Sequence, residues 1–125
     1  MKSYEISYTD DTNCENIEKV YKYEFYLGEN SNENWKLLNK SKKWYYFFHL
    51  TDFPSGYGML ICEEGEDIPM DVIKQCGKHV LNKTKQKNRV NIRVDYTTYG
   101  NLKRGNKEGE VLFKKSNKVK VVYIP

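Results

Sequence analysis

The stretch Trp44-Tyr-Tyr-Phe-Phe-His-Leu-Thr-Asp-Phe-Pro-Ser-Gly-Tyr-Gly-Met-Leu-Ile61 decides the fold of this chain. Residues 44–50 are apolar on both faces apart from His49, and they are rich in the aromatic residues that favour strands. This run is too short for a buried helix, so it predicts a central β-strand. Residues 52–56 then reverse the chain, and the apolar residues 59–62 predict a neighbouring strand of the same sheet.

Two segments before this pair alternate apolar and polar residues, as half-buried strands do. Residues 3–8 and 20–27 are therefore predicted to be strands, joined by a polar loop over 9–18. Their inward side chains are expected to be Tyr4, Ile6, Tyr8, Tyr21, Tyr23, Phe25 and Leu27.

Two helices are predicted from capping residues and spacing. Asn30, with Glu33 three positions later, forms a variant of the capping box, and the short helix that follows is expected to bury Trp35 and Leu38. A second helix is predicted over 69–84, with Pro69 in its first turn. Its apolar stripe comprises Val72, Ile73, Cys76 and Val80, while Lys74 and Lys78 fall along its opposite side.

From Lys85 onward the chain is predicted to be extended, with Val90, Ile92 and Val94 pointing into the core. This alternation sends four basic residues to the other face, in a strip of Lys85, Lys87, Arg89 and Arg93. Residues 96–109 look too polar and too rich in glycine for a core, so they are predicted to be a loop. Residues 110–114 and 118–124 are predicted to finish the chain as two connected strands, the second with Val119, Val121 and Tyr123 inward.

Together these elements predict a single α+β domain over residues 1–125, with a mixed or antiparallel sheet of about six or seven strands and two helices. A chain of 125 residues can bury a core without metal or disulfide staples. The three cysteines, Cys14, Cys62 and Cys76, are far apart and match no C-x-x-C pair, so we expect free thiols and a reducing compartment. No signal segment or membrane-spanning run is apparent, which predicts a cytoplasmic protein.

The net charge of +4 hides an asymmetry between the two halves. Residues 1–70 carry 7 Lys and Arg against 13 Asp and Glu, whereas residues 71–125 carry 14 against 4. The second half thus has the charge balance of a polyanion-binding surface, although ordinary solvated lysines would give the same count. The lack of alanine and the abundance of Asn and Lys indicate an AT-rich genome, such as that of a giant DNA virus or a protist. If the source is a virus, the protein is expected in the cytoplasm of the host.

The residue pattern gives little support for a catalytic site or a metal site. His49, Asp52 and Ser55 lie within seven residues astride a turn, without the glycine-flanked serine of a nucleophile elbow, so we expect structural roles for them. The two histidines, His49 and His79, have no matched cysteine or carboxylate cluster, so no metal and no cofactor are predicted. Among the eleven tyrosines, Tyr99 is the candidate for stacking on a base, with Tyr57 as a second.

An ordered set of motifs resembles the NFACT RNA-binding (NFACT-R) domain. The motifs comprise the segment 28–34 with Leu37, Phe47-Phe-His49, Asp52, Pro54-Ser55, Tyr96-Thr97, Lys103-Arg104 and Gly109-Glu-Val111. The likeness covers residues 21–122 and is closest to the free-standing eukaryotic version, the coiled-coil domain-containing protein twenty-five type. This sequence departs from the pattern at Phe47, where the family usually has Trp, and at Tyr57, where it usually has His.

The resemblance implies an α+β domain that contacts RNA. We therefore expect a non-catalytic module that binds structured RNA, ribosomal or transfer RNA, with DNA as a further ligand and the ribosome as a further partner. The candidate contact residues are Lys74, Lys78, Lys85, Lys87, Arg89, Arg93, Tyr99, Lys103, Arg104 and Lys107. The motif residues with expected structural roles are His49, Asp52, Pro54 and Ser55. The alternatives are a protein-interaction adaptor that docks through the acidic N-terminal half and, third, an enzyme.

Overall fold

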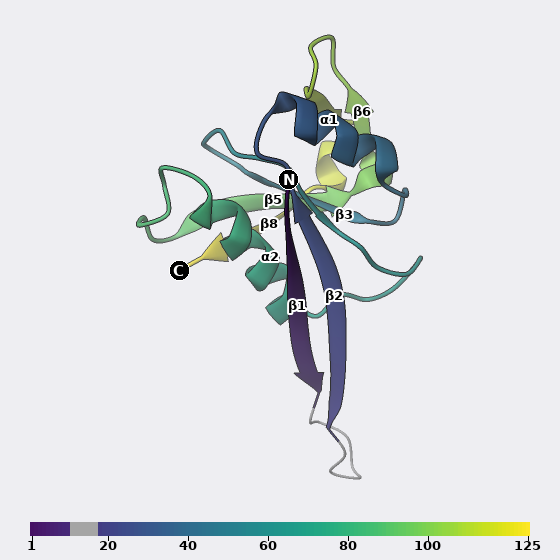
Figure 1. Cartoon of the computed structure of the whole chain (residues 1–125), viewed down its shortest axis with the longest axis vertical. Coiled ribbons are helices and arrows are strands. Elements are labelled where there is room, and N and C mark those ends of the chain that lie inside the picture. Colours follow the sequence, from purple (N-terminus) through teal and green to yellow (C-terminus); the bar gives the residue numbers. More distant parts are fainter. Residues whose placement is uncertain (11–17) are drawn as a thin grey trace.

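The computed structural model describes residues 1–10 and 18–125 (Figure 1). Most of the predicted loop over 9–18 lies outside the described residues, and so does Cys14. The predicted α+β class is confirmed, because the described residues form two α-helices, a six-stranded sheet and a two-stranded sheet.

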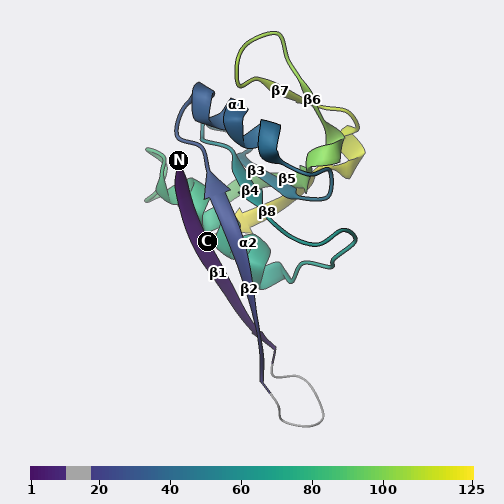
Figure 2. The ribbon, with the colours of Figure 1, turned by 45° about the vertical axis from the view of Figure 1, so that its right-hand side comes forward.

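The strands of the large sheet are β1 (Lys2–Asp10), β2 (Lys19–Leu27), β3 (Tyr46–Leu50), β4 (Gly58–Leu60), β5 (Ile92–Thr98) and β8 (Lys120–Ile124). Their order is β1-β2-β4-β3-β5-β8, and every neighbouring pair is antiparallel. The aromatic run around Phe47 therefore forms an inner strand beside β4, as predicted. β1 and β2 pair along their whole length, and the end of this pair near Asp10 and Lys19 extends away from the rest of the domain (Figures 1 and 2).

One face of the large sheet is covered by α2 (Met70–Asn82). The buried stripe predicted for this helix is present, and Gly77 lies on it where an added Cβ would stand 2.9 Å from Ile124 Cδ1. The helix can therefore approach the sheet closely at this turn. It begins at Met70, so Pro69 precedes the helix instead of lying in its first turn. Tyr21, predicted to face inward here, is 41% exposed.

The opposite face is covered by α1 (Ser31–Lys40) together with the two-stranded sheet of β6 (Leu102–Arg104) and β7 (Val111–Phe113) (Figure 2). The predicted cap is present, because the Asn30 side chain accepts a hydrogen bond from Glu33 N at 2.9 Å. The helix buries Leu37 and Leu38, whereas Trp35 is only partly buried. The consecutive residues Phe47 and Phe48 point into opposite cores, which is why both faces of this strand are apolar.

The prediction of a strand from Lys85 is wrong. Residues 83–91 form consecutive turns, in which the Thr84 hydroxyl accepts a hydrogen bond from Gln86 N at 3.1 Å. Asn91 has φ 56°, a left-handed conformation that redirects the chain just before β5 begins. Val90 is 71% exposed instead of buried, while Ile92 and Val94 point into the core as predicted.

The end of the chain also differs from the prediction. Residues 96–109 are not one loop, because they include the end of β5, a 3-10 turn and β6, and because Thr97, Asn101 and Leu102 are buried. The last two strands do not pair with each other, since β7 pairs with β6 and β8 pairs with β5. β8 faces the opposite way from the prediction: Val122 and Ile124 are buried, whereas Val121 and Tyr123 are 42% and 59% exposed.

Candidate nucleic-acid interface

The stretch from Gly28 to Asn34 and the distant β3–β4 connection meet in one corner. Gly28 donates its N–H to Tyr57 O at 3.0 Å, and Tyr57 N donates to Asn34 Oδ1 at 3.1 Å. An added Cβ at Gly56 would stand 1.9 Å from Gly28 O, and one at Gly28 would stand 2.2 Å from Asn34 Oδ1. Only glycine at these two positions lets the chain after β2, the first turns of α1 and the β3–β4 connection come this close.

A groove of about 510 Å³ opens beside this corner. It is lined by Glu29, Asn30, Ser31, Asn34, Pro54, Ser55, Gly56, Lys83, Thr84 and Lys85. Part of the lining is the N-terminal end of α1, where the Asn30 side chain caps Glu33 N and the helix dipole favours negative charge. Lys83 and Lys85, from the turns after α2, also line the groove, so it combines a helix N-terminus and two lysines with the one carboxylate of Glu29.

The turn of the β6–β7 hairpin packs against the start of α1. Gly109 has φ 78°, and an added Cβ there would lie 3.1 Å from Ser31 Cα. Ser31 also lines the groove, so the hairpin turn lies next to this part of the lining. The hairpin carries the predicted contact residues Lys103 and Lys107, both of which are exposed.

Arg104 holds the hairpin onto α1. Its guanidinium carbon lies 4.6 Å from the centre of the Trp35 ring, and its Nη2 donates a hydrogen bond to Asn39 Oδ1. This stacking explains why Trp35 remains partly exposed instead of entering the core. Arg104 therefore has a structural contact as well as the position of a candidate contact residue.

The four residues of the predicted strip do not share one face, because the strand that would align them is not formed. Lys85 lines the groove and Lys87 is exposed on the following turn. Arg89 lies over the Phe53 ring at 5.2 Å. Arg93 Nε donates to Asp52 Oδ2 at 3.0 Å, and this hydrogen bond, with the attraction of the guanidinium charge, lowers the pKa of Asp52.

The remaining predicted contact residues lie away from the groove wall. Lys74 and Lys78 are exposed on α2, and the turns after that helix lead to Lys83. Tyr99 packs as a partly buried ring against the core under α1, so its ring face has less freedom to stack on a base than the sequence predicted.

The residues that resembled a catalytic triad have separate partners. Ser55 Oγ accepts a hydrogen bond from Leu50 N at 3.1 Å and donates one to Gly56 O at 3.0 Å. Asp52 pairs with Arg93 instead of joining the other two residues. His49 is half-buried near the rings of Phe47 and Tyr57, and desolvation lowers its pKa.

Sequence reasoning missed Lys83 and a second basic cluster. A smaller hollow of about 140 Å³ is lined by Lys114, Lys115 and Lys118 together with Thr98, Gly100 and Asn101. The buried Asn101 side chain organises this region, because it bonds Lys115 N and Lys115 O, both at 3.0 Å. The run Lys-Lys-Ser-Asn-Lys at 114–118 was the available sequence signal.

Residues 1–10 and 18–125 contain no group of three or more His, Cys, Asp or Glu side chains placed to hold a metal ion. Neither helix of this described part has the length and apolar content needed to cross a bilayer.

The fold and the groove define a three-layer α+β domain with a basic cleft at the start of α1. A family model, the NFACT protein RNA binding domain, matches residues 13–121 of the chain. The chain belongs to this family. Of the motif residues that carried the resemblance, Asn30, Asn34, Pro54 and Ser55 line the groove, whereas others, such as Phe47 and Tyr96, belong to the two cores.

Nine solved chains match the structure. One of them, the C-terminal of the fibronectin/fibrinogen-binding protein from Streptococcus suis, has a TM-score of 0.71 and 20% identity. The alignment covers 82% of this chain and 41% of that one, so this chain spans less than half the length of the solved chain. At such low identity the likeness shows the fold alone. No curated protein matches the chain.

Proposed function

We propose that this domain is a non-catalytic RNA-binding module that holds the phosphate backbone in the groove at the start of α1. The observation that carries the proposal is the convergence of family motif residues, Asn30, Asn34, Pro54 and Ser55, with Lys83 and Lys85 around one groove. The family is described as an RNA-binding domain, which supports RNA as the ligand.

The chemistry of the groove suits a phosphate chain better than base edges. Lysine ammonium groups and the N-terminal end of a helix bind phosphate oxygens without reading sequence. The exposed Lys103 and Lys107 extend this positive surface along the β6–β7 hairpin, and the exposed Lys87 extends it along the turns after α2. We assign Lys74, Lys78 and Arg89 to the periphery of this surface. Arg93 and Arg104 are assigned a structural role, because each contacts another side chain of the chain.

The finer features of the function follow from the family resemblance. We propose a single domain over residues 1–125, closest to the free-standing coiled-coil domain-containing protein twenty-five type. Its ligand would be structured RNA, either ribosomal or transfer RNA. It would bind this RNA in the cytoplasm during ribosome-associated quality control. DNA would be a further ligand through the same phosphate contacts.

The test is binding of a fluorescent transfer RNA, measured by anisotropy at several salt concentrations. The double variant Lys83→Gln/Lys85→Gln should bind more weakly. Its slope of log K against log salt should be shallower by about 1.4 to 1.8, because each lost phosphate contact contributes about 0.7 to 0.9.

A matched control removes the same charge elsewhere. Lys19 and Lys22 lie exposed on β2, away from the groove, so Lys19→Gln/Lys22→Gln should leave the slope close to that of the wild type. Equal losses in both double variants would mean that the total charge, and not the groove, determines binding, and the proposed site would then be wrong.

A further inference from the structure

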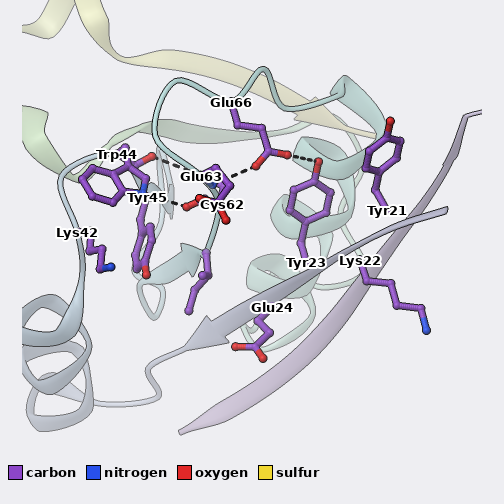
Figure 3. A pocket seen from close by; sticks show the side chains of 11 residues that line it. Tyr21, Lys22, Tyr23, Glu24, Lys42, Trp44, Tyr45, Cys62, Glu63 and Glu66 are labelled. Carbon is purple, nitrogen blue, oxygen red and sulfur yellow. Dashed lines mark hydrogen bonds between the residues drawn. The ribbon is translucent and has the colours of Figure 1, made fainter. Parts of the chain in front are cut away.

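A second cavity, of about 380 Å³, lies in the acidic half of the chain, between β2, the segment before β3 and the segment after β4 (Figure 3). Trp44 and Tyr45 stand on one side of it, and Tyr21 and Tyr23 stand on the other. The Trp44 indole is fixed in place, because its Nε1 donates to Cys62 O at 3.0 Å. The cavity thus has aromatic walls, at least one of which is rigidly held.

Three carboxylates, from Glu24, Glu63 and Glu66, also line the cavity. Glu66 accepts hydrogen bonds from Tyr23 Oη at 2.7 Å and from Glu63 N at 3.0 Å, and Glu24 accepts one from Tyr26 Oη at 3.1 Å. None of the three is in an ion pair within the described residues, whose ion pairs lie elsewhere. The cavity therefore holds negative charge that the chain itself does not neutralise by direct contact.

Two lysines border the cavity, and each has another contact. Lys22 points away from it in Figure 3 and lies 3.7 Å from Glu5. Lys42 Nζ lies 5.5 Å from the centre of the Trp44 ring, a cation–π contact within the chain. The Trp44 ring face is therefore already positioned to accept a cationic group.

An apolar hollow of about 220 Å³ adjoins this cavity, because Tyr45 and Ile61 line both. Its other apolar walls are Leu37, Met59 and the ring of Tyr26. It also includes Lys40 and Ser41 at the C-terminal end of α1, whereas the basic groove lies at the N-terminal end of the same helix. The two surfaces can therefore be tested separately.

We propose that this acidic, aromatic cavity is a docking site for a protein segment that presents an arginine beside an aliphatic side chain. The guanidinium enters between the aromatic walls and pairs with Glu63 and Glu24, and the neighbouring aliphatic side chain fills the apolar hollow. Arginine suits such a site because its planar group stacks on rings and bonds carboxylates at the same time. RNA does not suit it, because the three carboxylates would repel phosphate.

The probe is the peptide acetyl-Gly-Leu-Arg-Leu-Gly-amide, titrated into the full chain, with a second peptide carrying citrulline in place of arginine. Citrulline keeps the shape of arginine and removes its charge. The arginine peptide should bind at least about ten-fold more tightly, and NMR should show a shift of the Trp44 indole N–H signal while that of Trp35 stays in place. Equal binding of the two peptides, or no saturation by about 1 mM of either, would overturn the proposal.

Three single variants sharpen the test. Glu63→Gln should weaken binding of the arginine peptide by about two- to five-fold, as expected for one partly exposed charge pair. Glu64→Gln removes the same charge from the adjacent exposed residue, which does not line the cavity, and should change little. Lys42→Met should strengthen binding, because it frees the Trp44 ring face and removes a competing positive charge. Weaker binding by Lys42→Met, or equal effects of the two glutamate variants, would count against the cavity.

Excess transfer RNA separates this site from the basic groove. The arginine peptide should bind equally well in its presence, and Lys83→Gln/Lys85→Gln should leave peptide binding unchanged. Displacement of the peptide by RNA would contradict a separate docking site. Failure of RNA binding itself would leave the peptide result standing.

Discussion

Replacing Gly56 with alanine is expected to disrupt the corner that shapes the basic groove. The added Cβ would stand 1.9 Å from Gly28 O, and its nearest atoms belong mainly to backbone. A carbon and an oxygen that are not bonded need roughly 3 Å or more, so the two segments must separate by about 1 Å. The hydrogen bond from Gly28 N to Tyr57 O, at 3.0 Å, spans the same gap and would be stretched.

The cost can be estimated from the effects of overpacking. Inserting a methyl group into a tight site costs about 1–3 kcal/mol. For a chain of 125 residues this corresponds to a fall in Tm of roughly 4–12 °C, taking about 4 °C per kcal/mol. The loss should appear in urea denaturation as a lower midpoint with an unchanged m-value. Affinity for transfer RNA should also fall, because Gly56 and Asn34 form part of the groove wall.

Gly65→Ala serves as the comparison. Gly65 has φ 74° and nothing within 4 Å of an added Cβ, so alanine there costs only backbone strain, about 1 kcal/mol. It should therefore lower Tm less than Gly56→Ala does and should leave RNA affinity unchanged. If Gly56→Ala matched the wild type in both stability and RNA binding, the close approach of the two segments would not matter, and the account of the corner would be refuted.

Three further predictions concern stability and reactivity. Asn34→Ala should lower the free energy of unfolding, measured by urea denaturation, by about 1–3 kcal/mol, because it leaves Tyr57 N without its acceptor. Asn32 is exposed on the same helix, so Asn32→Ala should lower it far less. Equal effects of the two variants would contradict this role of Asn34. Burial lowers the pKa values of His49 and His79, so the unfolded chain takes up protons at a higher pH than the folded chain does. The free energy of unfolding should therefore be highest above about pH 6.5 and fall below it, less steeply in His49→Phe. A rise in the free energy of unfolding toward pH 5 would contradict this. Burial, with Glu66 and Glu63 nearby, raises the pKa of Cys62 to about 11, and burial also raises the pKa of Cys76. Both thiols should therefore react slowly with a disulfide reagent at pH 8, whereas all three thiols of the chain should react quickly after denaturation. Fewer than three reactive thiols in the denatured chain would reveal a disulfide.

Local patterns in the sequence were reliable where one face of an element differed clearly from the other. The alternation in β1 and, from Tyr23 onward, in β2, the Asn30 cap and the apolar stripe of α2 were all predicted and are all present. In each of these elements a single side can be buried, so periodicity alone identifies it.

The wrong predictions fall where the local pattern permits two answers. Residues 119–124 are apolar on both faces apart from Lys120, so nothing local distinguishes Val121 from Val122. The pairing of Val122 with Val94 on β5 determines which of the two side chains is buried. Between Lys85 and Val94 the alternation of basic and apolar residues suggested a strand, but the left-handed Asn91 interrupts it.

The candidate site was only partly predictable. The sequence showed that the second half is basic, and the family motifs selected Asn30, Pro54 and Ser55. Lys83 gave no signal of its own, because one lysine among many carries no information about its neighbours.

The sequence by itself determined the fold class, the central aromatic strand and the family, because these depend on local periodicity, turn chemistry and the order of short motifs. Only the tertiary structure decided which charges act together. The groove joins the start of α1, the β3–β4 connection and the turns after α2, and the acidic cavity likewise joins β2, the segment before β3 and the segment after β4. Electrostatic effects fall off with distance through space and not along the chain, so sites built from distant segments exist only once packing has brought those segments together.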